Sequence, residues 1–299
     1  MNSPSIAPDM PDAAARRAAL FHESPRDIAE RIALGLVWAM VPKRIGRLPN
    51  MARVWLRDTF LGSGSLPDPR TAGPGGIAGI ARDLSVETLL SAYKRTLYPW
   101  GHVGPFKWLS TDERCVLFFN ELHIAKRLRR QMRQNEYRVT FDADFEGVVS
   151  ACAERRPGRF HLTWLRPKLM RAYADLFDAG HAHSFEVWNK DGALAGGGYG
   201  VAVNGVFFTE SQFSRESNTS KMGFTLFNWH LAKWGFALND GKDPTPTINE
   251  MNFRMIPRSE LQAMLDRGNM ETCRVGRWHC ETDLKSIAEW QPGKETAPV

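Results

Sequence analysis

The chain has 299 residues, of which 43% are hydrophobic and 24% charged, and its net charge at pH 7 is +6. That length buries a hydrophobic core, and the ordinary balance of apolar and charged residues excludes a globally disordered chain. The basic excess fits contact with phosphate or with an anionic membrane and says nothing about the fold.

The four cysteines follow no CxxC spacing. Neither a disulfide framework nor a zinc site is therefore expected, and no metal is predicted. A reducing compartment is the simplest setting for such a chain, so we expect a cytoplasmic protein.

Residues 1–24 lack periodicity and are expected to form a flexible tail. Ser24-Pro25 then predicts a helix that runs to Met40 and is stopped by Pro42. Its apolar run of ten residues is too short to span a bilayer, which needs about 20. Because basic residues flank the run, two interpretations of residues 26–47 stay open. The preferred one is a helix packed on the protein's own body, and the other is peripheral contact with a membrane.

A second helix is expected at 51–60, followed by a Gly/Pro-rich linker at 62–76. Ser85 is a good N-cap for a helix that runs to about Leu97 and is broken by Tyr98-Pro99-Trp100-Gly101. Beyond this break, strands are expected at 106–109, 115–119 and 137–141, helices at 123–133, 145–153 and 166–179, and a basic loop at 155–161.

Two successive hairpins are predicted next. Strands at 183–188 and 193–203 are joined by a turn, and Asn204-Gly205 favours a type I′ turn into a strand at 206–213. A helix at 217–234, a strand at 236–239 and a helix from about Ile256 to Arg267 follow. This order predicts a mixed α+β fold.

An acyl-transferring fold of the acetyltransferase superfamily has this element order. Its members usually hold a coenzyme A pyrophosphate in a glycine-containing loop at a helix start. The corresponding segment here, 215–221, contains no glycine. The backbone cannot approach a diphosphate closely there, which argues against coenzyme A.

A series of motifs in this order resembles the bacterial leucyl/phenylalanyl-tRNA–protein transferases. The resemblance covers about residues 77–260. It rests on Tyr98-Pro99-Trp100, Trp108 with Ser110 and Arg114, Leu122-His123-Ile124, Thr163-Trp164, and the segments 180–188, 197–202, 207–214 and 218–221.

The resemblance implies a small N-terminal domain followed by an acetyltransferase-like (GNAT-type) domain with a mainly antiparallel sheet flanked by helices. We expect an extension at 1–75 with an amphipathic helix, the small domain at 76–118, the catalytic domain at 119–262 and a tail at 263–299. Members of this family move leucine, phenylalanine or methionine from its charged tRNA to a basic protein N-terminus, without metal or coenzyme.

The family's acidic pair falls on Glu210 and Asp240, which are predicted to be catalytic together with Lys242. Its Asp-x-Gln motif becomes Asp240-Gly241-Lys242 here, so a lysine replaces the expected glutamine. Four interpretations of Lys242 stay open: it binds a tRNA phosphate, binds an anionic acceptor, stabilises the oxyanion, or is a surface lysine in an inactive site. A lysine at this place would repel a cationic acceptor, which argues mildly for a different amine.

Two further groups of residues are predicted to bind the substrates. Aromatic and polar residues of the motifs are expected to hold the donor and the acceptor: Trp100, Trp108, Trp164, Trp188, Tyr199, Phe208, Ser211, Phe213 and Asn218. The basic helix is expected to contact tRNA phosphates through Lys126, Arg127, Arg129, Arg130 and Arg133. Three functions follow: transfer from aminoacyl-tRNA to a protein N-terminus, transfer to another amine (a small molecule, peptide or lipid), and tRNA binding without catalysis.

Overall fold

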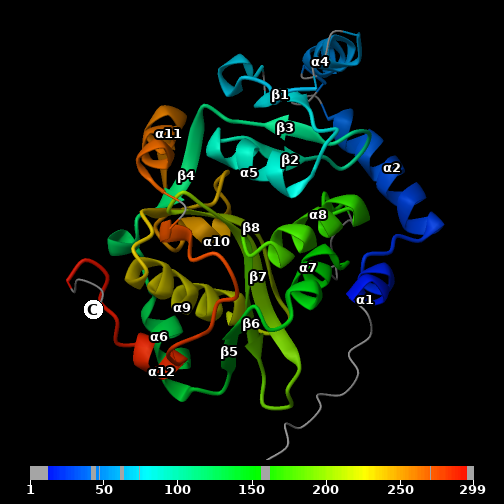
Figure 1. The fold of residues 1–299 in the computed structure, drawn as a ribbon. Coiled ribbons are helices and arrows are strands. Elements are labelled where there is room, and N and C mark those ends of the chain that lie inside the picture. The colour runs from blue at the N-terminus through cyan, green and yellow to red at the C-terminus, as the bar shows by residue number, and fades with distance from the viewer. Residues whose placement is uncertain are drawn as a thin grey trace, which may run out of the picture.

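The computed structural model describes residues 13–41, 45–46, 48–60, 64–73, 75–155, 162–269 and 271–294. Its fold is a mixed α+β arrangement of two sheets flanked by helices, as predicted (Figure 1). A three-stranded sheet has the order β1-β3-β2, and a seven-stranded sheet has the order β10-β4-β9-β8-β7-β6-β5.

Within the described residues, three α-helices precede the small sheet. They are α1 (Ala13–Leu20), α2 (Pro25–Ala39) and α4 (Leu48–Phe60). Because residues 13–20 form helix α1, the expectation of a flexible tail up to residue 24 is wrong for this part. Residues 1–12 lie outside the described residues. Long-range ion pairs hold α1 in place, because Arg16 pairs with Asp144 and Arg17 pairs with Glu146 and Asp178.

The small sheet consists of β1 (Ile77–Ile80), β2 (Tyr98–Trp100) and β3 (Lys107–Leu109), with α5 (Val86–Lys94) beside it. The break predicted at Tyr98-Pro99-Trp100 is therefore strand β2. Pro99 is tolerated in it because β2 is an edge strand, where the missing N–H need not join a ladder.

The larger sheet is antiparallel except that β8 (Val206–Ser214) and β9 (Leu238–Asp240) run parallel. It separates two hydrophobic cores. Because side chains alternate along β8, Phe207 enters the core shared with α9 (Thr219–Lys233), and Phe208 enters the core shared with α7 (Phe145–Ala153) and α8 (Pro167–Asp178). Figure 1 shows α7 and α8 on one side of this sheet and α9 on the other.

The predicted helix start at Ile256 is wrong, because this residue belongs to strand β10, which pairs with β4, and the helix begins at Arg258. The predicted basic loop lies outside the described residues from 156 to 161. The remaining elements are η1 (Pro69–Thr71), β4 (Glu113–Leu117), η2 (Phe119–Glu121), α6 (Lys126–Gln134), β5 (Arg138–Phe141), β6 (Ala182–Trp188), β7 (Leu194–Val203), α10 (Pro246–Asn249), β10 (Arg254–Pro257), α11 (Arg258–Arg267), η3 (Glu271–Cys273) and α12 (Leu284–Ile287).

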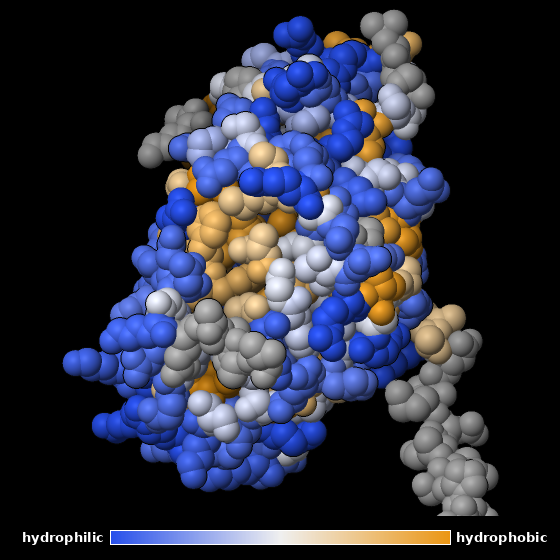
Figure 2. Space-filling model, turned by 60° about the vertical axis from the view of Figure 1, so that its left-hand side comes forward, coloured by the Kyte–Doolittle hydropathy of each residue, from blue (hydrophilic) through white to orange (hydrophobic). Residues whose placement is uncertain are grey.

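Hydrophilic residues cover most of the face drawn in Figure 2, and hydrophobic residues gather in a hollow near its centre. Within the described ranges, every helix is too short or too polar to cross a membrane.

Candidate active site

Glu210 occupies a β-bulge between β7 and β8. Tyr199 pairs with Ser211 and Gly200 pairs with Thr209, so Glu210 has no partner residue across the ladder. Bulges re-aim side chains and are frequent next to active sites. Gly200 permits this one, because a Cβ there would lie 2.2 Å from the Phe208 carbonyl oxygen.

The bulge places the Glu210 carboxylate, 1% exposed, among three donors. Oε1 accepts hydrogen bonds from the Tyr93 hydroxyl at 2.6 Å and from Lys242 Nζ at 2.7 Å, and Oε2 accepts one from the Tyr173 hydroxyl at 2.8 Å. Burial and the nearby carboxylate raise the pKa of both tyrosines, so their hydroxyls stay protonated and donate. The Glu210 side chain therefore does not point into solvent, as that of an ordinary residue on a surface strand would.

Asp240, at the end of β9, is fully buried in an ion pair with Arg114 of β4. Arg114 also donates to the Thr96 carbonyl at 2.8 Å. The other carboxylate oxygen of Asp240 accepts the backbone N–H of Lys242 at 2.8 Å. Such a hydrogen bond to the residue two positions on forms an Asx-turn. Asp240 therefore fixes the backbone from which Lys242 projects.

Lys242 adopts a left-handed backbone conformation with φ of 65°. Such conformations are uncommon for non-glycine residues and cluster at functional sites. Its side chain is 10% exposed and donates to Glu210 and, at 2.8 Å, to the Thr209 carbonyl. The interpretation of Lys242 as a surface lysine is therefore wrong. An ammonium carries three N–H donors, so one donor remains beyond these two bonds.

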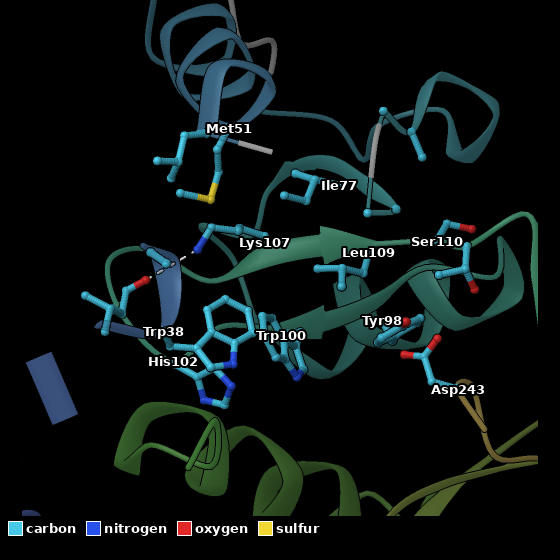
Figure 3. Close-up of a pocket in the computed structure, with 18 of the residues that line it drawn as sticks. Trp38, Met51, Ile77, Tyr98, Trp100, His102, Lys107, Leu109, Ser110 and Asp243 are labelled. Carbon is cyan, nitrogen blue, oxygen red and sulfur yellow. Dashed lines mark hydrogen bonds between the residues drawn. The ribbon is translucent and has the colours of Figure 1, made fainter. Parts of the chain in front are cut away.

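A pocket of about 710 Å³ adjoins this charged cluster (Figure 3). Strands β2 and β3 form its floor, and α2 and α4 of the N-terminal extension supply part of its wall. In Figure 3, Trp38 and His102 lie at one end, Trp100 lies between, and Tyr98 and Asp243 lie at the other end. Lys242 Nζ is 5.4 Å from the centre of the Tyr98 ring, which connects the pocket to the charged cluster.

Three aromatic rings gather at the first end. The ring centroids of Trp38 and Trp100 are 5.7 Å apart, and those of Trp100 and His102 are 4.5 Å apart. Lys107 also lines the pocket, and its Nζ donates to the carbonyls of Val103 and Pro105. Burial lowers the pKa of Lys107 to about 8, with a smaller contribution from a nearby arginine. Aromatic rings on which a base can stack, next to a cation that can bind a phosphate, are suited to a nucleotide.

The second end of the pocket is acidic. Asp112 and Asp243 line it, and both are exposed. Ser110 and Tyr98 lie beside them, and burial raises the pKa of Tyr98. This end can therefore receive a cationic group that approaches from solvent.

The predicted substrate-binding residues are dispersed. Of the nine, Trp100 is the one that lines this pocket within the part of the chain that the structure describes. Trp188 lies at the end of β6, where its indole donates to Thr140, and the Asn218 side chain donates to Gln131. Trp108, Tyr199, Phe208 and Phe213 are buried in a hydrophobic core, Trp164 is half-buried against the same core, and Ser211 is half-buried on β8.

The basic helix is α6, and its five cations divide into two groups. Lys126, Arg127 and Arg130 are exposed. Arg129 donates instead to the carbonyls of Ala288 and Trp290, and Arg133 pairs with Glu289. The first group has the freer side chains for contact with phosphate.

The sequence-based prediction missed five residues around the site: Trp38, Tyr93, His102, Lys107 and Tyr173. Tyr93 and Tyr173 occur in helices whose periodicity indicates only a core position. Trp38 lies in the extension, more than sixty positions from its partner Trp100, and no local pattern marks it.

Comparisons with known proteins place the charged cluster in a family. The sequence profile of the family described as leucyl/phenylalanyl-tRNA protein transferase matches residues 116–266. Proteins named leucyl/phenylalanyl-tRNA–protein transferase are similar over most of their length. The one from Alkalilimnicola ehrlichii is 41% identical over 216 residues, covering 72% of this chain and 83% of the relative. The one from Pseudomonas syringae pv. syringae is 45% identical over 65% of this chain and 84% of the relative.

A third, from Maridesulfovibrio salexigens, is 39% identical over 75% of this chain and 94% of the relative. Glu210, Asp240, Lys242 and helix α6 all lie within the matched residues, whereas Trp38, Trp100 and Lys107 precede them. On this evidence, the chain belongs to the leucyl/phenylalanyl-tRNA–protein transferase family.

Proposed function

We propose that this protein transfers leucine, phenylalanine or methionine from its charged tRNA to the N-terminal amine of an acceptor protein. The observation that carries the proposal is the ammonium of Lys242, which is held by Glu210 and Thr209 beside the Tyr98 end of the pocket and keeps one further N–H donor. A cation held in this way suits the oxygen on which charge develops when an ester carbonyl is attacked.

In this mechanism, the acceptor amine attacks the carbonyl carbon of the aminoacyl ester. The bond to the ribose oxygen then breaks, an amide forms, and the amine's proton passes to the departing ribose oxygen, which leaves as a hydroxyl. A protein N-terminus has a pKa of about 7.7–8.0, so near neutral pH only mild base assistance is needed. Lys242 donates its remaining N–H to the carbonyl oxygen, and Asp240 acts as a positioning residue because it is fully buried.

For the donor, the pocket offers its stacking end. Trp38, Trp100 and His102 receive the terminal base of the tRNA, and Lys107 faces the phosphate. Lys126, Arg127 and Arg130 of α6 contact the phosphate backbone further along the tRNA. This assignment is supported by the aromatic grouping and by the exposure of these three basic residues.

For the acceptor, a basic N-terminal residue requires a negative partner. Glu210 is already paired with Lys242 and Asp112 with Arg258, so we assign that role to Asp243 at the exposed end of the pocket. The pairing of Glu210 with Lys242 also favours the second candidate function, transfer to an amine that carries no further cation. Replacing Asp243 separates these two alternatives.

The proposal includes an acetyltransferase-like organisation for residues 119–262, with the small domain at 76–118, the extension at 1–75 and the tail at 263–299. It is supported by the antiparallel strands β5 to β8, the helix α9 after them, and β9 parallel to β8.

The test incubates the protein with leucyl-, phenylalanyl- or methionyl-tRNA and with peptides that begin with Arg, Lys, Ala or Asp. Mass spectrometry should show one added residue on the Arg and Lys peptides. Lys242→Met should abolish transfer, whereas Lys233→Met, at a surface ion pair, should preserve it. Asp243→Asn should remove the preference for basic peptides. Intact charged tRNA with no peptide modified would refute transfer and leave a tRNA-binding protein.

A further inference from the structure

The N-terminal extension exposes an unusual number of hydrophobic side chains. In the described part of the chain, twelve large hydrophobic residues are exposed, and ten of them lie between residues 28 and 60. Six are on or just after α2 and three are on α4: Ile28, Ile32, Leu36, Val37, Met40, Val41, Trp55, Leu56 and Phe60. We call these nine residues the apolar surface. Concentrations of this kind mark interaction sites.

Both helices turn their opposite faces toward the protein body. On α2, Arg31 donates to the His102 carbonyl, and a Cβ on Gly35 would lie 2.1 Å from Val103. On α4, Val54 is buried, and Met51 lines the same pocket as Gly35 and Trp38. The apolar surface is therefore the outer side of two helices that are already anchored. Figure 1 shows α2 and α4 at the periphery of the fold.

The charge of this segment indicates what kind of partner the apolar surface binds. Between residues 25 and 60, the sequence has seven basic and three acidic residues, a net charge of +4 against +6 for the whole chain. The acidic side chains are occupied, because Asp27 caps α2, Glu30 pairs with Arg155 and Asp58 pairs with Arg57. Of the basic ones, Arg31 is paired with Glu23. Arg26 and Arg53 are exposed on the same two helices as the apolar surface. The segment as a whole is apolar and positively charged.

We propose that the apolar surface docks the protein on an anionic lipid membrane, with α2 and α4 lying in the interface. Aliphatic side chains enter the acyl region while neighbouring arginines meet lipid phosphates, a combination typical of interfacial helices. An RNA partner would satisfy the arginines but would leave the aliphatic side chains in water. A second copy of the chain would bring two surfaces of the same charge together.

The test is flotation of the full-length protein with vesicles of phosphatidylcholine alone or mixed with phosphatidylglycerol. Binding is expected to the mixed vesicles and should weaken at high salt. Replacing Arg26 and Arg53 with Gln should weaken it about thirtyfold, because each basic residue near an anionic surface contributes roughly a factor of five. No binding to the mixed vesicles would overturn the proposal.

Val37→Glu with Met40→Glu should abolish vesicle binding without loss of the fold, since these side chains are 68% and 65% exposed. The matched control is Met255→Glu with Val275→Glu, two large hydrophobic residues that are exposed outside the extension, and it should bind as the wild type does. Equal loss in the control would overturn the proposal. So would sedimentation showing a wild-type dimer that Val37→Glu with Met40→Glu dissociates, because it would assign the surface to a second copy.

Discussion

Replacing Lys242 with methionine should destabilise the protein far more than loss of an ordinary surface lysine. The Glu210 side chain is 1% exposed, and in this variant it would keep only the two tyrosine hydroxyls as donors. Removing one partner of a buried ion pair costs about 3–5 kcal/mol, because the remaining charge is left without compensation. In a chain of this size, each kcal/mol shifts the melting temperature by about 2–4 °C, so a fall of roughly 6–20 °C is expected.

The measurement is urea and thermal unfolding of three variants beside the wild type. Lys242→Met combined with Glu210→Gln should recover most of the loss, because a neutral amide replaces the unpaired carboxylate. Lys233→Met is the control: it removes the partner of Glu281, and the two side chains are 31% and 36% exposed. Such exposed pairs contribute about 0.2–1 kcal/mol.

Two results would refute this reasoning. The first is a loss for Lys242→Met no larger than the control's loss. The second is a double variant no more stable than the single one, which would show that the unpaired carboxylate is not the source of the effect.

Three other predictions concern the donor site, pH and tRNA. Trp38→Ala should raise KM for charged tRNA with kcat unchanged, by roughly 5- to 150-fold, since stacking on a base contributes about 1–3 kcal/mol. Burial raises the pKa of Glu186 to about 7, so the folded state retains a proton that the unfolded state releases. Stability should therefore fall by roughly 3 kcal/mol between pH 4.5 and 7, and Glu186→Gln should remove this component. Arg127→Gln and Arg130→Gln should each lower the slope of log K for tRNA binding against log salt concentration by the amount that about one phosphate contact contributes.

Each of these has a matched control and a contrary result. Trp55→Ala removes an exposed tryptophan of α4 outside the pocket, and an equal rise in its KM would contradict stacking by Trp38. If the difference in stability between wild type and Glu186→Gln is the same at pH 4.5 and 7, Glu186 does not titrate in this window. Lys190→Gln removes the same charge from an exposed lysine that pairs with Glu136. If Lys190→Gln lowers the salt dependence of tRNA binding as much as the α6 variants do, α6 contributes only to the overall positive charge.

Much of the site can be predicted from the order of residues. Turn signals locate β6, β7 and β8, because Asn189-Lys190-Asp191-Gly192 separates the first two strands and Asn204-Gly205 the last two. The motifs place Glu210, Asp240 and Lys242 in a known family, which the comparisons confirm. These features are local, because strand alternation and turn chemistry act within a few residues of the chain.

The partners of these residues depend on the tertiary structure. Lys242 meets Glu210 across 32 positions, and Arg114 meets Asp240 across 126. Both pairings follow from the order and register of β4, β9 and β8, together with the one-residue bulge that turns Glu210 inward. Register is set by packing and hydrogen bonds between distant strands, so local propensity carries little information about it. The sequence by itself determined the main strands and the family, and it predicted Glu210 and Asp240 as an acidic pair, whereas only the folded chain decided that Lys242 pairs with Glu210 and that Trp38 lines the pocket.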